Sequence, residues 1–456
     1  MKITTNLQWM EADFIEASKF FEKTEDLEIL HEHKQEGTVV FDSVSILDKK
    51  YEFSKDIGNT ADSIEEKRYV KRYAKLALYK ALSDFLGQKL IWGAMTGIRP
   101  VKYAYSMGEN WREEMAEEML VDESKLDIVG RIIEEQKGIY ELKDDNCDFF
   151  VSIPFCPSRC LYCSFLSNEI GKEKQLDGYI DALVKEIENA KPLIKNLRSV
   201  YVGGGTPVSL PLHMLEKVLK AIGKVDCEYT VEAGRPDVIE RETLELLKKY
   251  GVTRICINPQ TFNDKTLKII GRKHTADDIY KKYELAKEFG FSVNMDLIAG
   301  LTGESLEDFK FSIDKAVDLN PDNITVHTLS LKKGSKLKEM TERLAEGEIA
   351  KMIDYSVYKL INNGYNPYYM YRQKYMAGNL ENTGYTKKGK ACIYNVDVME
   401  EISDNLACGA NAVTKKLILS ENRIERYGAP KDIKTYIEKV DKIIEEKNKF
   451  FLDNSL

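Results

Sequence analysis

Three closely spaced cysteines constrain this chain more than any other feature. Cys156, Cys160 and Cys163 form a C-x3-C-x2-C array directly after a short apolar run that ends at Ile153 and Pro154. Thiolates are soft metal ligands, and three of them can hold one iron–sulfur cluster while leaving one iron without a protein ligand. Such an open iron can bind a substrate or a cofactor, as a catalytic zinc ion does at its free position. The array therefore predicts an iron–sulfur cluster with an open coordination site.

A zinc ribbon, a disulfide and chance spacing each account for the array less well. A zinc ribbon needs a second pair of cysteine or histidine ligands, and none follows within about 20 residues. A disulfide is disfavoured because five further cysteines are scattered along the chain, which is typical of a reducing compartment rather than a disulfide framework. Chance spacing is disfavoured by the aromatic residues Tyr162 and Phe165 on either side of the last cysteine.

Composition excludes several classes of protein. At 456 residues the chain is long enough for two to four domains. Its net charge of −8 argues against nucleic acid as a partner. The first residues form no apolar signal-peptide core, and no apolar stretch approaches the length of a transmembrane helix. We expect a cytoplasmic protein with no membrane span and no nucleic-acid partner.

Hydrophobic periodicity predicts the fold of the middle of the chain. Strand-like segments alternate with helix-like segments, which is typical of a parallel sheet covered by helices. The predicted strands are 148–153, 198–202, 228–232, 252–257, 291–297 and 322–327. Six such units are too few for a closed eight-fold barrel, so we expect an α/β fold with a partial, open (β/α)6 barrel.

Two further domains are expected around the barrel. Residues 1–145 contain a strand at 38–47, a possible partner at 51–53 and a helix at 62–87, and we expect them to form a small N-terminal α/β domain. The barrel then covers 146–335, and a C-terminal α+β domain covers 336–456. Its last helix is predicted over 430–448.

Polar and glycine residues recur where the predicted strands end. Sites in such folds lie at the carboxyl ends of the strands, and the cysteine loop follows the first of them. The other candidates are Gly204, Gly205 and Thr206 after the second strand, Glu232 after the third, Gln260 and Arg272 after the fourth, Asp296 in the fifth and His327 in the sixth. Each has an ordinary structural alternative: a tight turn for the glycines, a surface charge for Glu232, a packed polar side chain for His327. Their ordered recurrence favours a ligand site.

A tyrosine-rich tract lies beyond the barrel, at 366–385, and contains Arg372 and Lys374. Its aromatic rings could stack on a flat macrocycle while the two cations pair with carboxylates. An aromatic interface beneath the barrel would account for the same composition equally well.

The cysteine loop I-P-F-C-P-S-R-C-L-Y-C-S-F resembles the signature of the radical S-adenosylmethionine superfamily, and more specifically the oxygen-independent coproporphyrinogen III oxidase family. The tracts W-G-A-M-T-G-I-R-P-V-K and Y-Y-M-Y-R-Q-K-Y-M resemble a longer branch of that family. The resemblance implies a 4Fe–4S cluster on the three cysteines. It also implies S-adenosylmethionine at the cofactor-binding positions Gly204, Gly205, Thr206, Glu232, Gln260, Arg272 and Asp296.

The resemblance also implies a reaction. Coproporphyrinogen III would lose hydrogen and carbon dioxide from two propionates, giving the vinyl groups of protoporphyrinogen IX in heme biosynthesis. The partners would be this tetrapyrrole, whose carboxylates would meet Arg272, Arg372 and Lys374, and an electron donor such as flavodoxin or ferredoxin. The alternatives are a heme chaperone, a radical enzyme acting on a different tetrapyrrole, and an iron–sulfur protein without radical chemistry.

One departure from the family pattern bears on the substrate. Shorter family members have Tyr and His in a Y-x-H-I-P-F-C pattern, whereas this chain has Phe150 and Ser152 at those places. Either other residues replace the lost hydroxyl and imidazole, or the substrate differs.

Overall fold

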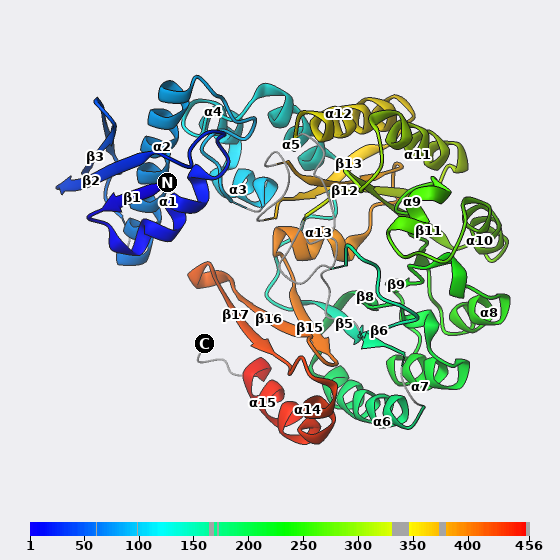
Figure 1. The fold of residues 1–456 in the computed structure, drawn as a ribbon. Coiled ribbons are helices and arrows are strands. Elements are labelled where there is room, and N and C mark those ends of the chain that lie inside the picture. Colours follow the sequence, from blue (N-terminus) through cyan, green and yellow to red (C-terminus); the bar gives the residue numbers. More distant parts are fainter. Residues whose placement is uncertain are drawn as a thin grey trace. The chain divides into compact units, whose positions relative to one another are not determined.

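A computed structural model describes residues 1–60, 62–97, 99–163, 168–170, 173–330, 346–373 and 380–452 (Figure 1). The chain divides into two compact units, Met1–Gly130 and Arg131–Leu456. The domain boundaries expected near residues 145 and 335 remain a proposal.

The first unit is built on a four-stranded sheet in the order β1-β2-β3-β4. Its strands are β1 (Lys2–Thr5), β2 (Glu28–Glu36), β3 (Val39–Ile46) and β4 (Lys49–Asp56). The strands β1 and β2 run parallel, whereas β2, β3 and β4 are antiparallel neighbours. Val40, Val44 and Ile46 of β3 are buried because alternate side chains of a strand point to one face, and the helix α2 (Ser63–Leu86) packs on that strand. The strands predicted at 38–47 and 51–53 and the helix predicted at 62–87 are confirmed.

Four shorter helices complete the first unit or cross its boundary. They are α1 (Glu11–Ser18), α3 (Pro100–Met107), α4 (Trp111–Glu117) and α5 (Glu123–Glu135).

The second unit contains an 11-stranded sheet whose central strands are parallel. Six of them follow one another in chain order: β5 (Asn146–Ile153), β8 (Asn196–Gly204), β9 (Glu228–Glu232), β10 (Arg254–Cys256), β11 (Ser292–Ala299) and β12 (Asn323–Thr328). All six predicted strands are therefore confirmed, as is the α/β class. Their carboxyl ends meet at one rim of the sheet.

Helices connect these strands and lie along the outer side of the curved sheet (Figure 1). They are α6 (Glu173–Ala190), α7 (Leu212–Ile222), α8 (Arg241–Lys249), α9 (Asp264–Ile269), α10 (Ala276–Glu288), α11 (Leu306–Leu319) and α12 (Glu346–Asn362). The starts of α10 and α11 are fixed by capping boxes, in which Thr275 and Ser305 accept hydrogen bonds from the third residue of each helix.

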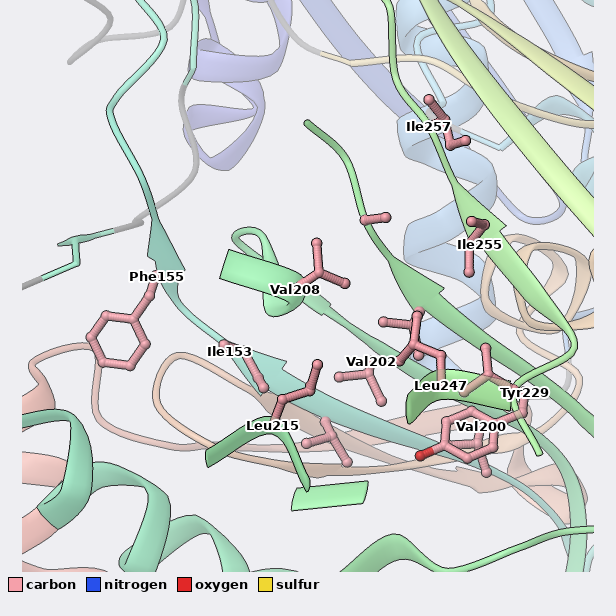
Figure 2. Close-up of a cluster of buried hydrophobic side chains, with 14 of the residues drawn as sticks. Ile153, Phe155, Val200, Val202, Val208, Leu215, Tyr229, Leu247, Ile255 and Ile257 are labelled. Carbon is pink, nitrogen blue, oxygen red and sulfur yellow. The ribbon is translucent and has the colours of Figure 1, made fainter. Parts of the chain in front are cut away.

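An apolar core joins these helices to the sheet. Figure 2 shows Val200 and Val202 of β8 with Leu215 of α7 and Leu247 of α8, and none of the four is exposed to solvent. Burying an aliphatic side chain of this size contributes about 1.5–3 kcal/mol to the free energy of unfolding. The packed core holds the strand ends, and hence the rim, in fixed positions.

The C-terminal part of the chain extends both edges of the same sheet. The strand β15 (Asp404–Cys408) runs parallel to β5, so the sheet has a seventh parallel strand that the sequence did not predict. The antiparallel strands β16 (Val413–Ile418) and β17 (Arg423–Gly428) follow it. At the other edge, β14 (Asn382–Thr386) and β13 (Asn366–Tyr371) pair antiparallel next to β12.

Three helices accompany these C-terminal strands: α13 (Ile393–Glu400), α14 (Ile433–Glu438) and α15 (Val440–Leu452). The prediction of one continuous helix over 430–448 is wrong. Lys439, with φ −111° and ψ 8°, interrupts the helical backbone, and a second helix starts at Val440. Both helices pack against α6.

Candidate functional site

The cysteine loop begins where β5 ends. Its first residues form the short strand β6 (Phe155–Cys156), which pairs with β7 (Asn168–Glu169). Cys160 is buried, whereas Cys156 and Cys163 are half-buried. Within the loop, the Cys163 amide donates to the Cys160 carbonyl at 3.1 Å. The loop therefore places the three cysteines after the carboxyl end of the first barrel strand, as the sequence predicted for their place in the fold.

Arg272 ties this loop to the neighbouring strand ends. Its Nη2 donates to the Tyr162 hydroxyl at 3.0 Å, and its Nη1 donates to the carbonyls of Asn258 at 2.7 Å and Gly234 at 3.2 Å. Burial lowers the pKa of Arg272, whereas the Tyr162 oxygen and the Cys160 sulfur raise it by more. The net pKa is above its ordinary value, so the guanidinium stays charged. Arg272 thus supports the loop between Cys160 and Cys163.

The glycine turn after β8 lies directly against the cysteine strand. The amides of Gly205 and Thr206 donate to the carbonyls of Ile153 and Phe155, at 2.8 and 2.7 Å. A Cβ on Gly205 would lie 2.4 Å from the Phe155 oxygen, and Gly204 has a φ of +104°. The Thr206 hydroxyl lies 3.5 Å from the Cys156 sulfur. Only glycine fits this close approach of two backbones.

Glu232 ends β9 beside the glycine turn. The Tyr201 hydroxyl donates to Glu232 Oε1 at 2.7 Å, and a Cβ on Gly203 would lie 2.9 Å from the Glu232 carboxyl carbon. Burial raises the pKa of Glu232 to about 7; the Asp296 carboxylate raises it as well, and the Tyr201 hydrogen bond lowers it. The carboxyl group therefore changes charge near neutral pH.

Gln260 and Asp296 lie side by side at the next strand ends. Gln260 has a left-handed φ of +68°, and its amide donates to the Asp296 carbonyl at 2.9 Å. The Asn294 amide group donates to Asp296 Oδ1 at 2.8 Å. On the other side, His327 Nε2 is 3.7 Å from Asp296 Oδ2, and the Tyr371 hydroxyl is 3.4 Å from His327 Nδ1. His327 thus faces the rim, with 27% of its side chain exposed.

The residues that depart from the family pattern have other contacts. Phe150 stacks on Tyr201 at 6.2 Å and on Tyr394 at 6.1 Å between ring centroids, and the two tyrosines stack on each other at 4.4 Å. The Ser152 hydroxyl donates to the Ala410 carbonyl at 3.0 Å, next to the strand β15. Phe150 has no hydroxyl, but the neighbouring strand provides one near Glu232, from Tyr201.

The tyrosine-rich tract packs largely as core. Tyr368 and Tyr369 are buried in a cluster with Cys392, whereas Tyr371 reaches the rim. Arg372 is 4% exposed; burial lowers its pKa to about 10, and the Glu381 carboxylate raises it. Lys374 lies outside the described residues.

Two contributors to the site were missed by reasoning from the sequence. Tyr201 stands two residues before Gly203, so strand alternation puts both on one face, and this signal could have found it. Tyr394 comes from α13, far along the chain, and no local pattern links it to the rim.

The donor set fits an iron–sulfur cluster with a bound cofactor. Among the described residues, no three His, Cys, Asp or Glu side chains converge on a single metal ion. A 4Fe–4S cluster does not need that convergence, because each thiolate binds a different iron. Beside the cysteines, the glycine turn brings its backbone directly against the cysteine strand, and a half-buried carboxyl group borders it. None of the described helices has the length and apolar character needed to cross a lipid bilayer.

Comparison with known proteins gives the class. Residues 150–316 match the Radical SAM superfamily. The fold is similar to that of "Coproporphyrinogen III oxidase (HemN) from Escherichia coli", with a TM-score of 0.54 and 22% identity over 67% of this chain and 71% of that one. The chain is a radical S-adenosylmethionine protein, and its cofactors are a 4Fe–4S cluster and S-adenosylmethionine.

Two related proteins indicate which family within this superfamily the chain belongs to. The chain is 34% identical to the "Oxygen-independent coproporphyrinogen-III oxidase-like protein HemZ" of Bacillus subtilis, over 84% of this chain and 81% of that protein. It is also 34% identical to "Heme chaperone HemW" of Lactococcus lactis, over 50% of this chain and 62% of that protein. The chain belongs to the family of oxygen-independent coproporphyrinogen-III oxidase-like proteins.

Proposed function

We propose that this protein catalyses the oxygen-independent oxidative decarboxylation of coproporphyrinogen III to protoporphyrinogen IX. The observation that carries the proposal is the single rim on which the cysteine loop, the glycine turn, Glu232 and the Asp296–His327 pair meet. The 34% identity to the HemZ protein over most of both chains supports the same conclusion.

The cofactor side of the rim comprises the residues nearest the cysteine loop. Cys156, Cys160 and Cys163 would hold the cluster. The turn at Gly204, Gly205 and Thr206 would meet the polar end of S-adenosylmethionine. When bound, the cluster and S-adenosylmethionine supply one-electron reductive cleavage and a hydrogen-abstracting radical.

The remaining cofactor residues orient and shield that group. Ionised Glu232 would accept hydrogen bonds from the ribose hydroxyls, with Tyr201 holding its other oxygen at 2.7 Å. Gln260 and Asp296 would border the adenosine, and Arg272 would hold the aromatic ring of Tyr162 against it. The buried positions of Gln260 and Arg272 would exclude water from the reacting centre.

The substrate side would be formed by His327, Tyr371, Arg372 and Lys374. A tetrapyrrole with four propionates needs cations and hydrogen-bond donors near its carboxylates. The partly exposed His327 ring, between Asp296 and Tyr371, would lie against a propionate. Each propionate would become a vinyl group by losing a β-hydrogen atom to the cofactor radical, carbon dioxide, and one electron to an external one-electron acceptor.

An anaerobic turnover assay tests the proposal. Cluster-reconstituted protein is incubated with S-adenosylmethionine, a reductant and coproporphyrinogen III, and the tetrapyrrole is analysed by mass spectrometry. We expect loss of two carbon dioxide units, matched by 5′-deoxyadenosine. Cys160→Ala should abolish both products, whereas Cys227→Ala, outside the array, should abolish neither. Formation of 5′-deoxyadenosine without decarboxylation would show that the protein is a radical enzyme but would exclude coproporphyrinogen III as its substrate. A different tetrapyrrole would then be the substrate to test.

Heme transfer is the second candidate function, favoured by the identity to the HemW chaperone. Anaerobic titration of the cluster-loaded protein with heme, followed by absorbance, distinguishes the two. Tight stoichiometric heme binding in a protein that produces no decarboxylated tetrapyrrole would support the chaperone.

A further inference from the structure

A buried arginine contacts the cysteine loop from the end of the third barrel strand. Arg235 follows β9 and is 2% exposed. Its Nη1 donates to the Ser158 hydroxyl at 2.8 Å and to the Ser158 carbonyl at 3.2 Å, and lies 4.0 Å from the Cys160 sulfur. One guanidinium nitrogen therefore points into the loop between the first two cluster ligands.

Asp237 holds the opposite side of the same guanidinium. Arg235 Nε donates to Asp237 Oδ1 at 3.0 Å and Nη2 donates to Oδ2 at 2.8 Å, so the pair is bidentate. Burial raises the pKa of Asp237, but the nearby His274 and Arg235 lower it to well below its usual range. The carboxylate is therefore charged at neutral pH, and its orientation aims Nη1 at the cysteines.

A histidine next to the Arg235–Asp237 pair is uncharged. His274 is 3% exposed, and its Nδ1 lies 3.7 Å from Asp237 Oδ1. Burial lowers the pKa of His274, so the ring is neutral near pH 7. The charged guanidinium of Arg272 also acts on the Cys160 sulfur. Next to that sulfur, Arg235 and Asp237 thus form an ion pair whose cation is the nearer charge.

Such a pair has a physical consequence for a cluster bound to the cysteines. Reduction adds one negative charge to the cluster. A buried cation and an N–H directed at a ligand sulfur stabilise that charge, and therefore raise the reduction potential, whereas a nearby carboxylate lowers it. Low local polarity strengthens both effects.

We propose that Arg235 is a positioning residue that raises the reduction potential of the cluster through Ser158 and Cys160, and that Asp237 opposes it. The inference needs the cluster but not the tetrapyrrole reaction, so it stands or falls independently of the proposed substrate.

The test is a potentiometric titration of reconstituted protein with dithionite, followed by the electron paramagnetic resonance of the reduced cluster. In Arg235→Gln we expect the ratio of reduced to oxidised cluster at a fixed potential to fall about tenfold, which is about 59 mV for one electron. Asp237→Asn keeps the shape and removes the anion, so its potential should rise. Arg241→Gln is the matched control, because it removes a surface cation paired with Glu288, and its potential should not move.

The opposite signs separate tuning from loss of structure. A loosened loop would shift the Arg235 and Asp237 variants in the same direction, and that result would overturn the proposal. An unchanged or lower potential in Asp237→Asn would overturn it as well. If Arg235→Gln does not retain its cluster, the Asp237→Asn titration decides alone.

Discussion

The hydrogen bond between Tyr201 and Glu232 makes a quantitative prediction for cofactor binding. Tyr201→Phe removes the hydroxyl that donates to Glu232 Oε1 and keeps the ring in its stack with Phe150 and Tyr394. A hydrogen bond to a charged group contributes about 1.5–3 kcal/mol, and one pKa unit corresponds to about 1.4 kcal/mol. The pKa of Glu232, now about 7, should therefore rise by about one to two units.

The direction of the pH effect follows from the charge that the cofactor requires. In the proposed function, ionised Glu232 accepts hydrogen bonds from the ribose, so affinity for S-adenosylmethionine should increase as the pH rises through about 7. In Tyr201→Phe the ionised fraction at pH 7 falls from about one half to about one tenth or less, which predicts at least about fivefold weaker binding there. The loss should largely disappear well above the new pKa.

The predicted pH dependence can be checked by equilibrium binding. The affinity of the cluster-loaded protein for S-adenosylmethionine is measured anaerobically from pH 6 to pH 9. Tyr394→Phe is the matched control, because it removes a hydroxyl from the same aromatic stack and leaves the Tyr201–Glu232 bond in place. A Tyr201→Phe variant that is equally weak at every pH, or a control with the same pH shift, would refute the reasoning.

Further predictions concern pH, packing and a buried ion pair. Between pH 4.5 and about pH 7, Glu232 keeps its proton in the folded protein but loses it in the unfolded chain, so the free energy of unfolding should fall as the pH rises through this range. Glu232→Gln should remove this pH dependence from urea-unfolding curves measured across the same range. Gly205→Ala places a Cβ 2.4 Å from a backbone oxygen of the cysteine strand and should abolish cofactor binding in calorimetry, while Gly428→Ala meets open space and should not. Lys447→Met removes the cation paired with the buried Glu186 carboxylate, which keeps hydrogen bonds from Gly409 and Tyr436. The substitution should cost about 3 kcal/mol in the same unfolding assay, against about 0.5 or less for the exposed Lys442→Met.

The sequence predicted the centre of the fold because local patterns there agree with the tertiary structure. The six barrel strands are short apolar segments separated by amphipathic helices, and each is buried in the parallel sheet as such a pattern predicts. The strand β15 escaped prediction because its position next to β5 depends on long-range pairing, such as Cys408 with Val151, that no local period records.

The same distinction applies to the site. Residues at strand ends could be found because parallel strands bring their carboxyl ends to one rim. The protein contacts of the side chains there could not be predicted from the sequence. The donors of Arg272, for example, meet Tyr162 and two carbonyls. The role of Tyr201 depends on a neighbouring strand and on a ring from α13, and both become adjacent only in the folded chain.

The most direct test of the proposed reaction follows one hydrogen atom. Coproporphyrinogen III carrying deuterium at the propionate β-carbons is incubated anaerobically with the reconstituted protein, S-adenosylmethionine and a reductant. If the rim places the propionate against the cofactor, 5′-deoxyadenosine will gain deuterium as the tetrapyrrole loses carbon dioxide. Decarboxylated tetrapyrrole with unlabelled 5′-deoxyadenosine, or no labelled product under conditions in which S-adenosylmethionine is cleaved, would contradict the proposed function.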